Sequence, residues 1–515
     1  EVVKRIREYK KMVWSNTLSY LTTFNNIHHL DFLAGYEIDD TYNDYLSGEA
    51  YNFTTPDKHA ISNGMKTVSV GGSDSRYRLV SYLSRLNYDY KNKYYLGASF
   101  RVDGSSRLHR DNRWGTFWSV SGAWRTIEEE FMQPVKDWLT DLRIRASYGV
   151  NGTLPSDYFG YMGLSSISGG YLEQPGIQMS QIANPNLKWE TNYNMNIGLD
   201  FGFWDRLNFT IEYYTRTTKN LLMDCPVSMT TGFSSYLMNI GEVKNKGIEL
   251  TINSTNIKIK DFSWNTTFNL GHNSNKVVKL DGEQTQIVSG TQIHKVGSSY
   301  RTFYVQEFAG INPETGNPLF YTNELDENGN YIKEITENSK NAQFIPYKHA
   351  EPTVNGGISN SLRYKWLDLN FLFSYQFGGY SYDTWAQKTE HGGYDSYANI
   401  PTYYRDSWKK PGDQTNIEVY MPGKSSSVSM HKITSSRRIH STDYFRLKNI
   451  TFGITLPKEW TNKINIGNVR FYASASNLWT WAAYDNYDPE AVSAGSATQT
   501  TPPLKTVTFG LNINF

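Results

Sequence analysis

The sequence has 515 residues, with 51 lysines and arginines, 50 aspartates and glutamates, and a formal net charge of +1. That length allows several soluble domains or one large barrel. No run of about 18 apolar residues occurs, which excludes a membrane-spanning helix, and no dense basic stripe points to nucleic acid as a partner. The single cysteine, Cys225, excludes an internal disulfide framework and a cysteine-rich metal site.

Aromatic residues are unusually frequent in this chain. They make up 15% of it, as 38 Tyr, 25 Phe and 14 Trp. A transmembrane β-barrel places aromatic girdles at both membrane interfaces, and only alternate residues of each strand meet lipid, so its average composition stays polar. The composition therefore favours an outer-membrane barrel over a globular enzyme.

Alternating segments recur along the chain. Between 193 and 203 the odd positions are Tyr, Met, Ile, Leu and Phe, and the even positions are Asn, Gly and Asp. Alternation resumes at 207–213 after a short link, which predicts an antiparallel hairpin. The same pattern occurs at 369–377, 469–476 and 508–515. When apolar and polar residues alternate over roughly 9–14 positions, the strand has one face suited to lipid and one polar face.

Strand 443–456 changes phase in its middle. Its apolar residues are odd-numbered up to Leu447 and even-numbered from Ile450 onward. One extra residue near Lys448 and Asn449 accounts for the shift, so a β-bulge is expected there.

The connections between strands alternate between short and long. The short ones are predicted at Asn25–His29, Tyr90–Lys93, Phe203–Arg206, Ile257–Asp261, Arg363–Trp366 and Pro457–Asn468. The long ones are predicted near 40–74, 150–186, 222–242, 275–350, 378–442 and 479–504. Because outer-membrane barrels have short periplasmic turns and long extracellular loops, we expect the long set on the cell exterior.

About fifteen strands fit this pattern, beginning near residue 10. Bacterial single-chain barrels have even strand numbers, and an open sheet would leave bare edges in lipid. We therefore expect further N-terminal strands that this chain does not contain. Residues 1–5 precede no apolar segment and form no signal peptide, so the N-terminus of an exported protein is expected elsewhere.

Six groups of residues, in order along the chain, resemble motifs of the SusC/RagA-type TonB-dependent transporters. They are Arg101–Arg107 with Asn112–Trp124, Asn184–Thr191, Asn245–Glu249, Asp443–Pro457, Val469–Leu478, and Tyr487–Glu490 with the terminal aromatic residue. Each match is modest alone, but six in order are specific.

The resemblance implies an all-β fold, a transmembrane antiparallel β-barrel of about 22 strands closed by an N-terminal plug. Residues 1–515 would then be about 15 C-terminal strands of that barrel, with the plug domain not in this chain. The resemblance also implies a TonB box acted on by the TonB-ExbB-ExbD complex, and a SusD-like lipoprotein as an extracellular lid. It places the protein in the outer membrane of a Gram-negative bacterium of the Bacteroidota kind, in contact with outer-membrane lipid. Transporter–lipoprotein pairs could further form a dimer.

One segment departs from the family pattern. Members often carry a calcium-like loop where this chain reads Asp326-Glu-Asn-Gly-Asn330, but no distant Glu has the required spacing. A β-turn built on Asn-Gly is the preferred interpretation. No metal and no other cofactor is expected.

A transporter needs a surface that holds its substrate weakly, and no catalytic constellation is expected. Sugars offer apolar faces to aromatic rings and hydroxyl groups to Asn, Asp and Arg. The segment 378–442 is rich in such residues, and the candidate substrate-binding residues are Trp385, His391, Tyr394, Tyr397, Tyr403, Tyr404, Arg405 and Trp408. The alternative is that these rings pack the loop against its neighbours and contribute to the outer girdle.

Other conspicuous residues have structural interpretations. Trp479 and Trp481 sit at a strand end, where an interface belt is expected. Asp488 and Glu490 flank a proline and are expected to diverge, which argues against a glycosidase pair. The terminal Phe515 resembles the assembly signal read by barrel-insertion machinery.

The leading functional hypothesis is TonB-dependent import of a large nutrient. Oligosaccharide is the first substrate candidate, and oligopeptide import of the RagA type is the alternative. A passive porin or structural barrel is a second class, and a soluble β-sandwich or propeller lectin is a third. An enzyme has the least support, because no nucleophile lies beside a base in the sequence.

Overall fold

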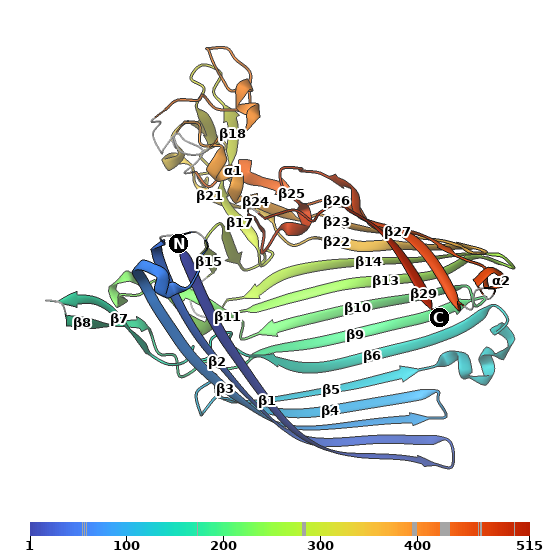
Figure 1. Ribbon diagram of the computed structural model, residues 1–515. Helices are drawn as coiled ribbons and strands as arrows, with labels where there is room; N and C mark the ends of the chain where they lie inside the picture. The colour runs from blue at the N-terminus through green and yellow to red at the C-terminus, as the bar shows by residue number, and fades with distance from the viewer. Residues whose placement is uncertain are drawn as a thin grey trace. The chain divides into compact units, whose positions relative to one another are not determined.

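The computed structural model describes residues 1–515 except 54, 56, 58, 172–173, 281–284, 394–398, 423–432, 462, 464–465, 499 and 515. Its main feature is a sheet of fifteen strands, which succeed one another in chain order (Figure 1). The predicted strand number and all-β class are therefore confirmed. None of the described helices is long and apolar enough to cross a membrane.

The large sheet is built from long strands. They are β1 (Val2–Phe24), β2 (His28–Phe53), β3 (Gly64–Tyr90), β4 (Tyr94–Ser105), β5 (Trp114–Trp124), β6 (Leu139–Thr153), β9 (Glu190–Phe203), β10 (Leu207–Lys219), β13 (Glu242–Ile259), β14 (Phe262–Lys279), β22 (Val354–Tyr364), β23 (Leu367–Phe377), β26 (Tyr444–Thr455), β27 (Asn468–Ala482) and β29 (Thr506–Asn514).

Smaller elements occupy the connections. The strands are β7 (Leu164–Tyr171), β8 (Gln174–Gln181), β11 (Leu222–Pro226), β12 (Ser235–Asn239), β15 (Gln286–Ser289), β16 (Gln292–Lys295), β17 (Thr302–Gln306), β18 (Phe308–Ile311), β19 (Pro318–Tyr321), β20 (Ile335–Thr336), β21 (Phe344–His349), β24 (Tyr380–Asp383), β25 (Ile439–Ser441) and β28 (Ser496–Ala497). The α-helices are α1 (Thr384–Thr389) and α2 (Lys458–Thr461). The 3-10 helices are η1 (Ile61–Asn63), η2 (Thr126–Glu128), η3 (Glu130–Val135), η4 (Met229–Thr231), η5 (Ser339–Asn341), η6 (Thr402–Asp406), η8 (Ser436–Arg438) and η10 (Pro489–Ala491).

The described residues form two compact units. The first comprises Glu1–Gln133, Arg143–Ile197 and Thr215–Glu242, and the second comprises Pro134–Leu142, Gly198–Tyr214 and Val243–Phe515.

Tight turns join neighbouring strands in both units. Asn25 and Asn26 between β1 and β2, and Lys91 and Asn92 between β3 and β4, all have positive φ angles between 51° and 58°. Such angles give a turn whose twist matches that of the paired strands. The short connections at these positions are therefore confirmed.

Two aromatic ladders cross the apolar face of the first unit. In one, ring centroids are 6.1 Å apart for Trp14–Tyr36, 5.1 Å for Tyr36–Tyr82 and 6.4 Å for Tyr82–Trp114. The other joins His28, Tyr90, Tyr94 and Trp124 at 5.0, 6.3 and 6.4 Å. The first ladder ends at Trp114 and the second at Trp124, which are the first and last of the 11 residues of β5. A strand of that length tilted by about 40° spans about 25 Å, the height of the apolar band of an outer-membrane barrel.

The strands β1, β2 and β3 continue far beyond the first of these ladders (Figure 1). The sequence places a loop at 40–74, and this prediction is wrong for most of the segment. Pairing of β2 with β3 runs up to Phe53 and Gly64, so the connection is confined to 54–63. The Ser, Gly, Asp and Asn residues here resemble loop composition, yet the backbone still forms ladder hydrogen bonds. We call residues 2–13, 39–53 and 64–79 the arm.

The apolar face changes character where the arm begins. Tyr36 pairs with Tyr82 and Ile38 pairs with Val80, but the next residue on that face, Asp40, pairs with Arg78. The Asp40 carboxylate accepts hydrogen bonds from Arg76 Nε at 2.8 Å and from Arg78 Nε at 2.9 Å. Because charged side chains are costly in an apolar surrounding, this change marks the end of the apolar band.

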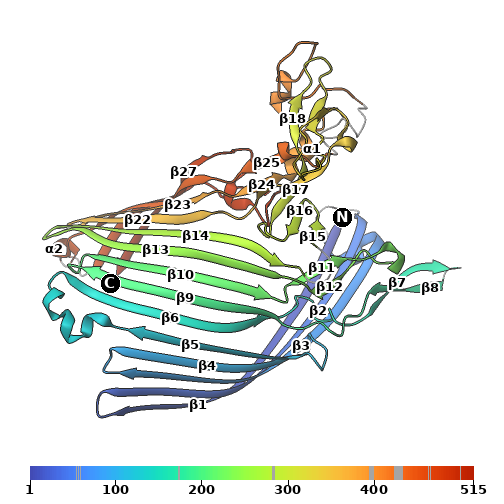
Figure 2. The same cartoon turned by 180° about the vertical axis from the view of Figure 1, so that it is seen from behind.

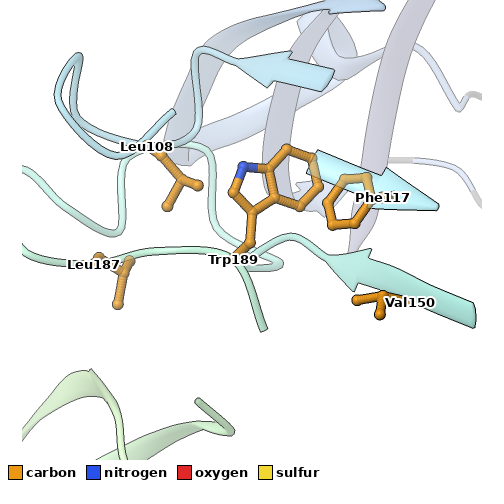
Figure 3. Close-up of a cluster of buried hydrophobic side chains, with 5 residues drawn as sticks. All are labelled: Leu108, Phe117, Val150, Leu187 and Trp189. Carbon is orange, nitrogen blue, oxygen red and sulfur yellow. The ribbon is translucent and has the colours of Figure 1, made fainter. Parts of the chain in front are cut away.

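Residues from two of the motif segments, 112–124 and 184–191, meet in one hydrophobic cluster beside the strand ends (Figure 3). Its buried members are Leu108, Phe117, Val150, Leu187 and Trp189. The Trp189 indole nitrogen donates a hydrogen bond to the Arg113 carbonyl at 3.0 Å. The motif residues at 184–191 and 112–124 are thus packing residues that join two connections.

In the second unit the predicted β-bulge is confirmed. The register of β26 against both β23 and β27 skips one residue between Leu447 and Asn449, which is Lys448. The bulge moves Leu447 and Ile450 onto the same face although one is odd-numbered and the other even-numbered.

Candidate functional site

The long connections of the second unit fold together into one body at one end of β22, β23 and β26, the end opposite α2 (Figures 1 and 2). We call it the loop body, and it contains β15–β21, β24, β25, β28 and α1. Strand β24 is its centre, because β25 pairs with it antiparallel and β28 pairs with it parallel. The β24 residue Tyr382 is fully buried beside Phe303, Val305 and Ile439. Three connections that are far apart in sequence therefore share one core.

A second contact joins two of these connections. The Trp408 indole nitrogen donates a hydrogen bond to the Pro313 carbonyl at 2.7 Å. A Cβ atom on Gly316, whose φ angle is +71°, would lie 2.6 Å from the Trp408 ring, so the ring needs a glycine beside it. Trp408 is thus held as a packing residue.

Arg438 forms a buried ion pair in the loop body. Its guanidinium is 0% exposed and contacts the Glu390 carboxylate through Nη1. The Tyr403 hydroxyl donates to the other Glu390 oxygen, and Arg438 Nη2 donates to the Glu390 carbonyl at 3.3 Å. Burial lowers the pKa of Arg438 to about 10, which leaves it charged at neutral pH. Removal of either partner of such a buried pair would leave an uncompensated charge away from water.

Asp383 organises the neighbouring aromatic residues. Its carboxylate accepts hydrogen bonds from the Ala386 backbone N–H at 2.7 Å, which caps α1, and from the Tyr484 hydroxyl at 3.0 Å. The Tyr484 ring stacks on His440, with centroids 3.7 Å apart and planes at 2°. Burial lowers the pKa of His440 to about 4, so this imidazole is neutral at physiological pH.

A cleft of about 780 Å³ lies beside this cluster. Residues that supply rings and hydrogen-bonding groups to its lining are Trp385, Trp481, Tyr487, Asn486, Thr498 and Lys505. Trp385 and Trp481 are 41% and 49% exposed, so their ring faces are available to a ligand. Apolar faces beside amide and hydroxyl groups are the usual composition of a site that holds a polar organic molecule.

Arg446 anchors the last long connection to strand β26. Its side chain is 2% exposed and binds Asp488 Oδ2 at 2.5 Å and Glu490 Oε2. The Lys448 ammonium binds the same Glu490 oxygen at 2.7 Å, and Tyr444 donates to Glu490 Oε1 at 3.1 Å. Asp488 and Glu490 therefore converge on one guanidinium, and the prediction that they diverge is wrong. Their charges are neutralised, as suits an anchor rather than an acid/base pair.

The structure places the predicted binding residues in different environments. Trp385 lines the cleft, and Arg405 is exposed on η6. His391 and Tyr404 are buried, at 1% and 5% exposed, and are placed as packing residues. The Tyr403 hydroxyl donates a hydrogen bond to the Glu390 carboxylate. Tyr394, Tyr397 and Phe515 lie outside the described residues.

Sequence patterns missed the groups that hold the site together. Arg438, Glu390 and Arg446 stand isolated in the sequence, and their partners come from 13 to 48 positions away. The sequence offered one signal for these groups. An Asp-Pro-Glu segment follows a strand end rich in aromatic residues, and its two carboxylates are the ones that bind Arg446. Among the described residues no group of three or more His, Cys, Asp or Glu side chains could hold a metal ion.

The segment 326–330 forms the expected turn. Gly329 has a φ angle of +80°, and its N–H donates to the Asp326 carbonyl at 3.0 Å. The Asp326 carboxylate accepts from the Asn328 and Asn330 backbone N–H groups at 2.9 and 2.8 Å. These bonds hold the pKa of Asp326 below its usual value.

Known proteins share this architecture and sequence. The family described as TonB dependent receptor-like, beta-barrel matches residues 6–331. TonB-dependent receptor P3 of Formosa agariphila is 32% identical over 536 residues, covering 97% of this chain and 52% of that protein. TonB-dependent receptor SusC of Bacteroides thetaiotaomicron is 30% identical over 496 residues, covering 92% of this chain and 47% of that protein.

A solved structure matches over the whole chain. The structure of the RagAB peptide transporter superposes with a TM-score of 0.88 at 27% identity, covering 100% of this chain and 56% of the matched one. The chain spans about half the length of the curated relatives it matches. With a family match over more than half of its residues, the chain belongs to the TonB-dependent receptor-like β-barrel family and is of the SusC/RagA type.

Proposed function

We propose that this chain forms the barrel wall and extracellular loops of an active importer of a large nutrient in the outer membrane. Movement would be energised by the TonB-ExbB-ExbD complex, and a SusD-like surface lipoprotein would close over the loop side. The observation that carries the proposal is the cleft in the loop body, because a fixed recognition surface at one end of the sheet is what such an importer requires.

Oligosaccharide is the proposed substrate class. The half-exposed rings of Trp385 and Trp481 can stack on the apolar faces of sugar rings, and Asn486 and Thr498 can bond hydroxyl groups. Of the charged residues in the lining, Arg446 is neutralised by two carboxylates, whereas Asp485 and Lys505 are exposed. The matched RagAB structure is that of a peptide transporter, which supports oligopeptide as the alternative.

Replacement of Trp385 by Ala in the full-length protein, produced with its lipoprotein, tests the cleft. We expect uptake of fluorescent oligosaccharides by whole cells to fall at least several-fold, because a stacking face is lost. Labelled oligopeptides measured in parallel decide the substrate class. Tyr331→Ala is the matched control, since this ring is also exposed, at 43%, and does not line the cleft. Unchanged glycan uptake in the Trp385 variant would remove the cleft from the mechanism.

A passive porin is the competing function. It predicts uptake that continues when TonB is deleted or the proton gradient is collapsed. Peptide uptake without glycan uptake would reverse our order of substrates while leaving the importer itself in place.

A further inference from the structure

One face of the arm continues the polar face of the sheet. It carries odd-numbered residues of β1, β2 and β3, because Tyr9 pairs with Asn43 and Asn43 pairs with Ser75. In the next row along the arm, Arg7 pairs with Tyr45. The side chains on this face combine charge, aromatic rings and hydrogen-bonding groups. We call six of them the platform, namely Arg5, Arg7, Tyr9, Asn43, Tyr45 and Ser75.

The two arginines of the platform are exposed and carry charge that is not paired. Neither Arg5 nor Arg7 forms an ion pair with a residue that the structure describes, and Arg7 lies against the Tyr45 ring with its Cζ 5.6 Å from the ring centroid. Glu49, an acid on the same face, accepts hydrogen bonds from Tyr51 and from another residue of β3. The two guanidinium groups lie about 7 Å apart along one strand and repel each other. A bound anion would replace this repulsion with attraction.

The opposite face of the arm treats its charges differently. There Lys10 binds Glu8 at 2.9 Å, and Arg76 and Arg78 both bind Asp40, at 2.5 and 2.9 Å. These cations are held by carboxylates of the arm itself. The platform therefore differs from the other face in leaving its guanidinium groups available to a ligand.

A cavity of about 300 Å³ borders the platform. Ser75 belongs to both, and Ser156, Asp157 and Phe159 supply other parts of the cavity wall. The Phe159 ring is 36% exposed, so it offers an apolar face beside hydroxyl and carboxylate oxygens. An apolar ring next to a few polar groups is the usual composition of a site for a polar organic molecule.

The wall between the cavity and the platform is held in place by a stacked cation. Arg107 Cζ lies 3.9 Å from the ring centroid of Tyr77 and 4.4 Å from that of Tyr158, another residue of the cavity lining. Tyr77 is two positions from Ser75 on the same face of β3. A guanidinium between two rings contributes about 1 kcal/mol or more per contact where water is excluded, so the cavity is ready for a ligand without rearrangement.

The spacing of the groups sets the size of the ligand. Ser75 and Arg7 are two strands and one row apart, which corresponds to about 12 Å, and Arg5 is about 17 Å from Ser75. A single sugar or an inorganic anion is too short to contact both the cavity and the arginines. The arrangement indicates an oligomeric ligand that carries negative charge.

We propose that the platform and its cavity bind an acidic oligosaccharide, one whose sugars carry carboxylate or sulfate groups. Arg5 and Arg7 bind the anionic groups, for which the planar guanidinium is well matched. The exposed rings of Tyr9 and Phe159 stack on sugar faces, and Asn43 bonds hydroxyl groups. This combination of rings with amide and hydroxyl groups favours sugars over an acidic peptide. The inference rests on the proposed import of oligosaccharide, and it adds a second recognition surface that selects for charge.

The test measures binding to the full-length protein, purified with its lipoprotein in nanodiscs. The probes are a fluorescent oligogalacturonate, a sulfated carrageenan oligosaccharide and a neutral dextrin of similar length. We expect at least one acidic probe to bind about tenfold more tightly than the dextrin, and the probe that does so distinguishes carboxylate from sulfate. Arg5→Gln with Arg7→Gln should abolish the preference. The matched control is Lys4→Gln with Lys10→Gln, which removes the same charge from the opposite face of the same strand and should keep the preference.

Salt gives a second readout. Added salt should weaken binding of the acidic probe to the unaltered protein and leave binding to the double arginine variant nearly unchanged, because exposed charges are screened. The shift of the folded barrel on unheated gels shows that each variant has folded.

Four outcomes would overturn the proposal. They are equal binding of acidic and neutral glycans, an unchanged preference in the arginine variant, tighter binding of an acidic peptide than of either acidic glycan, and loss of the lipoprotein from the purified arginine variant, since the platform would then hold that protein. Import that fails although the platform binds acidic glycans would count against the proposed function alone. Import of neutral glycans with no preference for acidic ones would count against this inference alone.

Discussion

At the scale of single residues, the loop body depends on ionisable groups that are kept away from water. His440 stacks against Tyr484, whose hydroxyl donates to Asp383. Burial is the main cause of the low pKa of His440, about 4 against the ordinary value of 6.5. A buried neutral imidazole contributes to stability only while it stays unprotonated.

We predict that the loop body loses stability as the pH falls through this range. The folded-state pKa lies below the unfolded value, so the stability is fully present above pH 6.5 and is lost progressively between pH 6.5 and 4. The shift corresponds to at most about 3 kcal/mol. Hydrogen exchange of residues 380–393 and 433–441 at several pH values measures the effect. His440→Phe keeps a ring against Tyr484 and should abolish the pH dependence, and an unchanged profile in that variant would contradict the assignment.

At the scale of elements, Arg446 connects a strand of the sheet to a loop. Its two carboxylate partners come from one short segment around η10, so a single side chain on β26 fixes the last long connection. Truncating one partner of a buried charge pair leaves uncompensated charge, which typically costs about 3–5 kcal/mol.

Replacing Arg446 by Ala should therefore release residues 483–497 from β26 while the sheet stays folded. Limited proteolysis should cut this segment at least tenfold faster than in the unaltered protein. Lys448→Ala is the matched control, because Lys448 binds the same Glu490 but is 35% exposed, and a pair with that exposure contributes about 1 kcal/mol or less. Equal cleavage rates in the two variants would show that Arg446 is not the anchor.

At the scale of the whole molecule, the sheet has a part inside the lipid band and a part beyond it. In the first unit the aromatic ladders set the two limits of that band, and the arm lies past one of them. Strand β3 shows the difference along its own length. Residues Leu79–Tyr90 pair with both β2 and β4, whereas 64–78 pair with β2 alone.

We predict two levels of hydrogen-exchange protection within β3. In nanodiscs, amides at 80–90 should exchange at least a hundredfold more slowly than those at 67–77, because the latter have one strand neighbour and lie in water. Exchange resolved to short peptides across β3 measures the contrast. The matched segment 28–38 of β2 should behave like 80–90, and uniform protection along β3 would place the arm inside the membrane.

Much of the fold could be predicted from the sequence, because every second residue of a membrane-spanning strand faces lipid and has to be apolar. The strand number, the tight turns and the bulge at Lys448 follow from alternation and its one change of phase. The arm could not be recognised, since strands in water tolerate Ser, Gly and Asp on both faces. The composition there is that of a loop, although the backbone is paired.

The candidate site was less accessible to sequence reasoning. Aromatic frequency pointed to the segment 378–442, but ring type does not tell a packing residue from an exposed one. Trp385 and Trp408 look alike in sequence, yet Trp385 lines the cleft and Trp408 is bonded to Pro313. The distinction depends on contacts between connections nearly a hundred residues apart, which no local pattern records.

The burial of Cys225 has a practical consequence for experiments on this chain. The residue is 2% exposed in β11, and burial raises the pKa of its thiol to about 11. Only the thiolate reacts with maleimides and similar reagents, so this thiol is nearly inert at neutral pH. A cysteine introduced at an exposed position such as Arg405 would then be labelled selectively without removing the native one. Distances between fluorophores or spin labels could follow the loop body during transport in an otherwise unaltered protein.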